Sequence, residues 1–240
     1  MIATNIENGI ATVTLDRPRR RNAMSADLVE AFIAFLAELP ERPEIRVIIV
    51  VGAGTGFCAG SDLAGLAGMD EAGRERFEAR SGLLARMITA ARVPVIAAVE
   101  GFAIGGGLTL ATACDIVVTA PSARWSLPEV PIGLFPAWGL FSVAARIGVP
   151  AARRLSWGID THDGTEARRI GLADIVSETP LAEAMTIAAS LADLPARQVA
   201  AVKTFFAQDG TGEDEDRRAN LLFIEMSRTR EAAASFERFA

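Results

Sequence analysis

Histidine, lysine and cysteine are scarce in this 240-residue chain, and each scarcity excludes a class of mechanism. A single histidine, His162, rules out a zinc site built from several histidines. It lies in the polar stretch 158–169 and the chain has no GxSxG motif, so we expect a solvent-exposed loop histidine rather than part of a serine triad. Lys203 is the only lysine, so arginines or backbone N–H groups must bind any anionic ligand.

Cysteine and net positive charge are also lacking. Cys58 and Cys114 have no CxxC or Cys/His spacing, and we interpret both as inert core residues of a protein from the reducing cytosol. With 24 basic and 30 acidic residues the net charge is −6, which disfavours nucleic-acid binding. No apolar run approaches the roughly 20 residues of a membrane span, and the start lacks the features of a signal peptide. We therefore expect a soluble, cytoplasmic protein that binds no nucleic acid, membrane or metal.

The apolar residues are arranged as expected for an α/β protein. Half of the residues are hydrophobic, enough to bury one large core. The continuous β-branched runs 45–51 and 93–99 are typical of strands buried on both faces of a parallel sheet. Shorter apolar stretches predict strands at 10–15, 115–120 and 174–178. Helical spacing and capping residues predict helices over 25–40, 70–88, 108–114, 140–157, 165–170, 181–193, 196–207 and 213–239. We divide the chain into an α/β core at 1–180 and a helical region at 181–240.

Two glycine-rich loops, 52–62 and 101–107, each follow a buried strand and precede a helix. Backbone N–H groups of such loops can bind developing negative charge. Residues 54–59 formally match the dinucleotide pattern GxGxxA, but the loop continues to Asp62 and no ribose-binding acid follows about 20 residues later. Neither loop has the Gly-Lys-Ser/Thr of a phosphate loop. A need for tight turns could explain the glycines of either loop alone. Two such loops, each between a buried strand and a helix, favour an anion-binding site.

Five sequence blocks occur in a characteristic order: RPRRRNAMS (17–25), FCAGSDL (57–63), PVIAAVEGFAIGGGLTLATACDIVV (94–118), WSLPEVPIGLFP (125–136) and RRIGLADIV (168–176). Together they resemble the enoyl-CoA hydratase/isomerase family, or crotonase superfamily, over nearly the whole chain. This resemblance implies a crotonase-like spiral of ββα units with a C-terminal helical trimerisation region, assembled as a homotrimer or a dimer of trimers. It also implies an acyl-CoA thioester substrate and no cofactor, because coenzyme A is part of the substrate.

The resemblance assigns catalytic roles to four positions. The family's oxyanion hole falls on the backbone N–H groups of Ser61 and Gly106, and the two glutamates of a hydratase fall on Thr109 and Glu129. Because the first glutamate is replaced, the resemblance favours double-bond isomerisation by Glu129, with an auxiliary role for Thr109. The alternatives are an atypical hydratase with one glutamate and a non-catalytic acyl-CoA binding protein. Apolar neighbours of Glu129 are expected to raise its pKa toward that of a useful base.

The resemblance also suggests binding residues. Those expected near coenzyme A are Arg19, Arg21, Ala23, Ala59 and Asp62, and those expected in the acyl pocket are Leu66, Met69, Phe135 and Trp138. Asp115 is expected to have a packing or capping role. The C-terminal helices contain several large apolar residues that we expect to dock on a neighbouring subunit, where they would complete its pocket: Leu221, Leu222, Ile224, Met226, Phe236 and Phe239.

Overall fold

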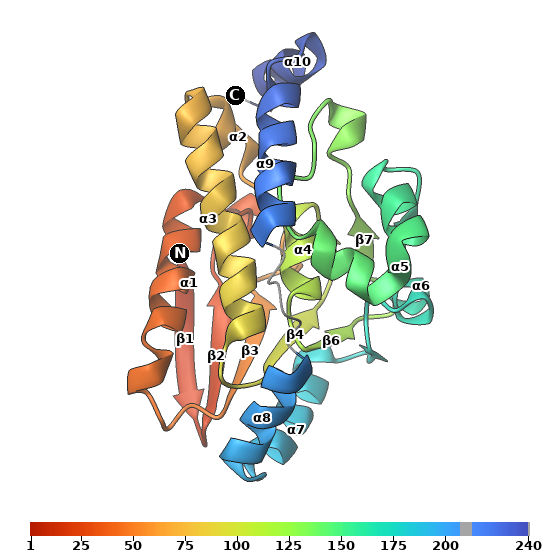
Figure 1. Ribbon diagram of the computed structural model, residues 1–240. Coiled ribbons are helices and arrows are strands. Elements are labelled where there is room, and N and C mark those ends of the chain that lie inside the picture. The colour runs from red at the N-terminus through yellow and green to blue at the C-terminus, as the bar shows by residue number, and fades with distance from the viewer. Residues whose placement is uncertain (207–212, 240) are drawn as a thin grey trace.

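The computed structural model describes residues 1–206 and 213–239, and within them the strands form two sheets (Figure 1). The larger sheet has the order β1-β2-β3-β4-β6-β9 and the smaller one the order β5-β7-β8. The strands are β1 (Ile2–Glu7), β2 (Ile10–Leu15), β3 (Val47–Gly52), β4 (Val95–Val99), β5 (Phe102–Ile104), β6 (Ile116–Thr119), β7 (Arg124–Ser126), β8 (Thr161–His162) and β9 (Ile175–Val176).

Ten α-helices are present in the described residues. They are α1 (Ala26–Ala37), α2 (Leu63–Ala67), α3 (Glu71–Ala90), α4 (Gly106–Thr112), α5 (Leu140–Ser156), α6 (Gly164–Ile170), α7 (Pro180–Ala192), α8 (Ala196–Phe206), α9 (Glu213–Ser227) and α10 (Arg230–Phe239). The predicted N-cap of α1 is confirmed, since the Ser25 side chain accepts a hydrogen bond from the backbone N–H of Leu28.

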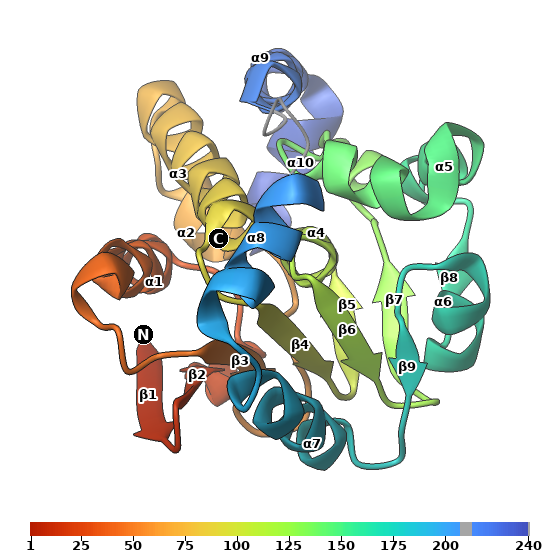
Figure 2. The same ribbon diagram turned by 60° about the horizontal axis from the view of Figure 1, so that its bottom comes forward.

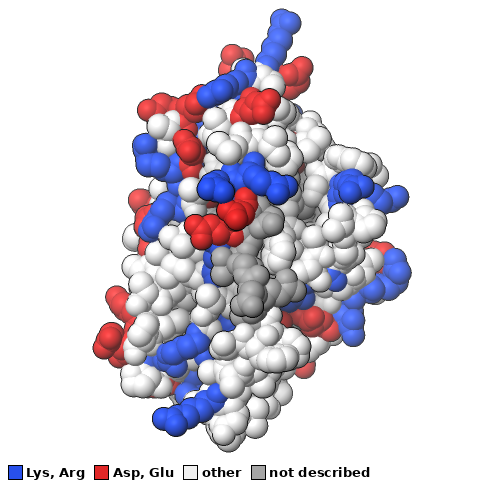
Figure 3. Space-filling model, viewed as in Figure 1, with Lys and Arg blue, Asp and Glu red and all other residues white. Residues whose placement is uncertain are grey.

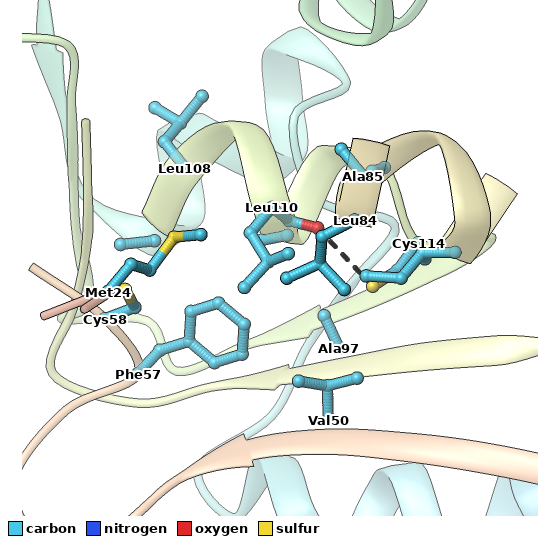
Figure 4. Close-up of a cluster of buried hydrophobic side chains, with 14 of the residues drawn as sticks. Met24, Val50, Phe57, Cys58, Leu84, Ala85, Ala97, Leu108, Leu110 and Cys114 are labelled. Carbon is cyan, nitrogen blue, oxygen red and sulfur yellow. Dashed lines mark hydrogen bonds between the residues drawn. The ribbon is translucent and has the colours of Figure 1, made fainter. Parts of the chain in front are cut away.

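The buried apolar runs form the parallel centre of the larger sheet, as predicted. Strands β2, β3, β4, β6 and β9 pair in parallel, and β1 joins β2 as an antiparallel edge strand. Alternate residues of one strand point to opposite faces: Val50 packs in the main core and Ile49 in a smaller cluster on the other face. Figure 4 shows the main core where α3 and α4 lie over β3 and β4, with the side chains of Phe57, Leu84 and Leu110 between the helices and the sheet.

Helix α7 covers the opposite face of the larger sheet, where Ala184 and Ala188 join the smaller cluster (Figure 2). The helix packs on β2, β3, β4 and β6. The first helix of the region 181–240 thus completes the core of the sheet rather than standing apart from it.

The C-terminal helices pack against other helices of their own chain. The predicted helix 213–239 is two helices, α9 and α10, and α9 packs along α3 (Figure 1). Ile224 and Phe236 are buried in the chain's own core, whereas Leu221 and Leu222 are exposed. The expectation that all of these apolar residues require a neighbouring subunit is therefore wrong for Ile224 and Phe236. Residue 207, at the end of the predicted helix 196–207, and the side chain of Phe239 lie outside the described part of the chain.

Other differences from the sequence-based expectations involve short elements. Strands β1, β5, β7 and β8 were not predicted, because two- and three-residue strands carry little periodicity and β1 is an exposed edge strand. His162 is half-buried in β8 and pairs with Trp125, so the expectation of an exposed loop histidine is wrong. Helix α5 has a kink at Gly148, whose φ of 75° interrupts the helix before Pro150.

The surface carries charges of both signs. Acidic and basic side chains are interspersed on the face seen in Figure 3, with uncharged surface between them. No helix among the described residues combines the length and apolar character needed to cross a membrane. On α8 an apolar face is exposed, with Phe205 81% and Phe206 74% accessible.

Candidate active site

The two glycine loops meet at the start of α4. Cys58 and Ala103 form a parallel bridge, and the Ile104 N–H donates to the Cys58 carbonyl at 3.0 Å. This contact needs a residue without a side chain at position 107, where a Cβ would lie 2.3 Å from the Cys58 carbonyl oxygen. The close approach of the loops brings Ser61 and Gly106 together: a Cβ at Gly106 would lie 3.5 Å from the Ser61 nitrogen.

The N–H groups of Ser61 and Gly106 are available to a ligand. Both residues line one cavity, and neither N–H donates to an acceptor within residues 1–206 and 213–239. Gly106 is the first residue of α4, so its N–H belongs to the group that a helix leaves unpaired at its start. Two adjacent free donors of this kind can bind an oxygen atom on which negative charge develops.

Glu129 enters the same cavity from the segment after β7. The Gly105 N–H donates to the Ser126 carbonyl at 2.9 Å, which joins this segment to the start of α4. Gly105 has a φ of +55°, and a Cβ there would lie 2.7 Å from Oε1 of Glu129, so glycine is needed for both conformation and space. The other carboxyl oxygen, Oε2, is buried and has no hydrogen-bond partner in the described residues. Burial raises the pKa of Glu129 to about 7, opposed by a hydrogen bond from its own backbone.

A second carboxyl group, that of Glu78 on α3, also lines the cavity. Its side chain is buried, and its Oε2 accepts a hydrogen bond of 2.9 Å from Nε1 of Trp138. Its Oε1 accepts a longer bond of 3.4 Å from the Ser61 hydroxyl. Burial raises the pKa of Glu78 to about 8; the Trp138 hydrogen bond lowers it, and the charge of Glu129 raises it further.

The sequence analysis did not predict Glu78 as a site residue, because Glu78 lies outside the five sequence blocks that carry the family resemblance. A signal was present, since Glu78 shares the buried face of α3 with Ser81 and Ala85, at spacings of three and seven residues. A carboxyl on the apolar face of a helix is unusual enough to be a candidate functional group.

Most residues expected in the site lie around this cavity. Those lining it are Ala59, Ser61, Leu66, Gly106, Thr109, Glu129, Phe135 and Trp138. Met69 does not line it and packs, partly buried, against the main core. The Thr109 hydroxyl donates to the Gly106 carbonyl at 3.1 Å, so its proton is engaged within α4. Phe223 of α9 lines the cavity as well, which means that the chain supplies a C-terminal wall for its own cavity.

The residues expected near coenzyme A lie beside the first glycine loop. Arg19 is exposed, and the Arg21 guanidinium lies 4.4 Å from the centre of the Phe102 ring. The Ala59 N–H donates to the Arg21 carbonyl, which joins this segment to the loop. Asp62 forms an ion pair of 2.7 Å with Arg17 and caps α2 through the Gly65 N–H.

Two expectations about structural residues are confirmed. Asp115 accepts a hydrogen bond from the Val95 N–H at 2.7 Å and forms an ion pair with Lys203, which joins β4 to α8. Cys58 and Cys114 are buried, and burial raises the pKa of each thiol to about 12. Neither thiol is therefore activated as a nucleophile.

Known proteins of similar sequence and fold identify the family of this chain. The family model for enoyl-CoA hydratase/isomerase matches residues 5–238. The chain is 33% identical over 174 residues to a short-chain-enoyl-CoA hydratase of Clostridium acetobutylicum, covering 72% of this chain and 67% of that protein. It is 32% identical over 206 residues to a probable enoyl-CoA hydratase of Mycobacterium tuberculosis, covering 84% and 79%. A crystal structure of an enoyl-CoA hydratase/isomerase from Mycobacterium paratuberculosis superimposes with a TM-score of 0.92 at 25% identity, covering 99% and 97%.

The fold is the crotonase fold, with two sheets and C-terminal helices. The chain belongs to the enoyl-CoA hydratase/isomerase (crotonase) family and is an acyl-CoA enzyme of that family.

Proposed function

We propose that this enzyme moves the double bond of a 3-enoyl-CoA to position 2. The observation that carries the proposal is a shared cavity: within the described residues, the N–H groups of Ser61 and Gly106 and the buried Oε2 of Glu129 that face it have no hydrogen-bond partner. Thr109 stands where a hydratase of the family has a second glutamate, and its hydroxyl proton is engaged by the Gly106 carbonyl. Isomerisation requires no activated water, so it does not depend on that glutamate.

The residues would act in two steps. The N–H groups of Ser61 and Gly106 bind the thioester carbonyl oxygen while the Glu129 carboxylate removes a proton from C2. The electron pair of the C2–H bond moves into an enolate conjugated with the 3,4 double bond. In this one-glutamate mechanism the protonated Glu129 then returns the proton at C4, and the double bond shifts to C2–C3. Because the pKa of Glu129 is about 7, its carboxylate is present at neutral pH yet basic enough to accept the proton.

Hydration is the second candidate, because the relatives compared above are named enoyl-CoA hydratases. A non-catalytic acyl-CoA binding protein is the third. One experiment distinguishes them: the purified protein is incubated separately with 3-enoyl-CoA and 2-enoyl-CoA, and the products are separated by chromatography. Isomerisation predicts conversion of the 3-enoyl substrate, and Glu129→Gln should lower kcat by about 10²-fold or more.

The matched control for Glu129→Gln is Glu75→Gln, the same chemical change at an exposed position of α3. Rapid hydration of 2-enoyl-CoA without isomerisation of 3-enoyl-CoA would contradict the proposal. Binding of both thioesters without turnover, unaffected by Glu129→Gln, would favour the binding protein.

We also propose that coenzyme A is bound by arginines and that the protein assembles through its exposed apolar surface. Arg19 and Arg21 are suitable for the phosphates of coenzyme A because guanidinium groups form paired hydrogen bonds with phosphate. A homotrimer or a dimer of trimers would cover the exposed apolar face of α8, where Phe205 and Phe206 lie. The cavity wall formed by Phe223 comes from the same chain.

A further inference from the structure

Glu78 has no task in a mechanism that uses Glu129 alone. A buried carboxyl group is costly unless its surroundings compensate for the lost water. In the described residues, Glu78 has two hydrogen-bond donors, the Trp138 indole and the Ser61 hydroxyl, and no cation as a partner. The longer of these bonds, at 3.4 Å, is weak.

Another buried acid nearby shows what a structural role requires. Asp216 on α9 forms an ion pair of 2.6 Å with Arg86 of α3 and accepts a hydrogen bond from the Gly139 N–H. Asp216 thereby joins α9 to α3 and to the start of α5. Glu78 lies eight residues before Arg86 on the same helix, about two turns away, but it lines the active-site cavity. Its surroundings resemble those of a reacting group more than those of an interhelical ion pair.

The two cavity carboxyls approach the oxyanion donors from different elements. Glu129 comes from the segment after β7 and lies against Gly105, the residue before α4. Glu78 comes from α3 and lies against Ser61 and Trp138. Glu78 brings α3 into the wall of the cavity that Ser61 and Gly106 also line. A thioester whose carbonyl oxygen binds these two N–H groups would therefore have carboxyl groups from two different elements beside its acyl chain.

We propose that Glu78 is a second catalytic carboxyl group, which protonates C4 of the acyl chain after Glu129 has removed the proton from C2. This inference rests on the proposed isomerisation. The electron pair of the broken C2–H bond forms the enolate, and the electron pair of the shifting double bond forms the new C4–H bond with the Glu78 proton. Glu129 ends protonated and Glu78 ionised; Glu129 then loses its proton to water and Glu78 takes up a proton from water, which restores the starting state.

The ionisation of the two groups fits these roles. Burial raises the pKa of both groups, to about 7 for Glu129 and about 8 for Glu78, so Glu129 is the carboxyl that ionises more readily. The charge of one carboxyl disfavours ionisation of the other, so the pair tends to hold a single proton. The other charged groups around the adjoining hollow that Glu78 also lines are Glu75, Arg86, Glu213, Asp216 and Arg217.

The test uses the full chain and 3-enoyl-CoA carrying deuterium at C2. We expect Glu78→Gln to lower kcat by about 10²-fold with KM changed less than about threefold, because general acid catalysis contributes 10²-fold or more. The fall of kcat at alkaline pH should also disappear. Glu78→Asp, which keeps a carboxyl group, should retain more activity than Glu78→Gln and keep the alkaline fall. Glu75→Gln is the control and should behave as the wild type.

The label gives an independent readout. In the wild type, deuterium taken from C2 should be absent from C4, because the C4 proton comes from Glu78. In the residual turnover of Glu78→Gln, Glu129 acts alone and should carry part of the deuterium to C4. Equal transfer in both proteins, or a kcat of Glu78→Gln within threefold of the wild type, overturns the role of Glu78.

Failure of this inference is distinguishable from failure of the proposed function. If the wild type does not isomerise 3-enoyl-CoA, the wild-type assay alone refutes the isomerisation and with it the C4 step. If the wild type isomerises and the kcat of Glu78→Gln stays within threefold of the wild type, only the role of Glu78 is refuted. Thermal denaturation of each variant establishes that it is folded before its activity is compared.

Discussion

The indole N–H of Trp138 donates a 2.9 Å hydrogen bond to Oε2 of Glu78, across 60 residues of sequence. Trp138 also closes the cavity beside α4: a Cβ at Gly106 would lie 3.1 Å from its ring. One side chain thus orients a buried carboxyl and fills the space beside a proposed oxyanion donor.

Trp138→Phe tests this contact. Because the hydrogen bond lowers the pKa of Glu78, its loss should raise that pKa and move the alkaline fall of kcat to higher pH. The kcat should also fall several-fold. Trp125→Phe is a suitable control, since Trp125 is buried and loses a similar bond, of 3.1 Å to Thr119, outside the cavity. Both variants should be less stable, and an identical pH profile for Trp138→Phe and wild type would contradict the prediction.

The two buried carboxyls should make the protein less stable as the pH rises. The pKa of Glu78 is raised from 4.5 to about 8 and that of Glu129 from 4.5 to about 7 in the folded state. Between pH 5 and these values the folded state holds more protons than the unfolded state, so the free energy of unfolding falls with increasing pH. Urea denaturation at pH 5, 6.5 and 8 should show a shallower fall for Glu78→Gln than for Glu75→Gln. The same slope in both would argue against the raised pKa of Glu78.

Gly105→Ala should lower activity by 10²-fold or more, because its Cβ would lie 2.7 Å from Oε1 of Glu129 and would displace that carboxyl. Gly148→Ala is the matched control. Gly148 also has a positive φ, 75°, but the nearest atom to its Cβ, on Pro150, is 3.9 Å away. Both variants carry backbone strain of about 1–3 kcal/mol. Steady-state kinetics should separate them, and equal losses of kcat would mean that strain alone is responsible.

Removal of the C-terminal residues should abolish both activity and assembly. A chain ending before Asp209, a residue outside the described part of the structure, lacks α9 and α10. It loses the packing of α9 on α3 and the Phe223 wall of the cavity. Light scattering and the isomerase assay measure the two effects. Phe205→Ser combined with Phe206→Ser, which removes the exposed apolar face of α8 and leaves the cavity intact, should weaken assembly alone. An active, monodisperse monomer of the shortened chain would refute the prediction.

Much of the fold was predictable because its signals are local. The apolar runs 45–51 and 93–99 identify the central strands, since only a strand buried on both faces accommodates continuous β-branched residues. Ser61, Gly106 and Glu129 were predicted from the family resemblance. Each belongs to one of the short sequence blocks that carry this resemblance, and the three line one cavity.

Tertiary structure alone decided the rest. Glu78 is 17 residues from Ser61 and 60 from Trp138 in the chain, and only folding joins the three. The raised pKa of a carboxyl is a property of the dielectric and charges around it, which no sequence motif specifies. The docking of α9 and α10 on their own chain was likewise undetermined, because an amphipathic helix reveals that it has an apolar face but not which surface covers it. The sequence by itself determined the fold class and the loops of the site, whereas contacts between distant segments decided which carboxyls meet there.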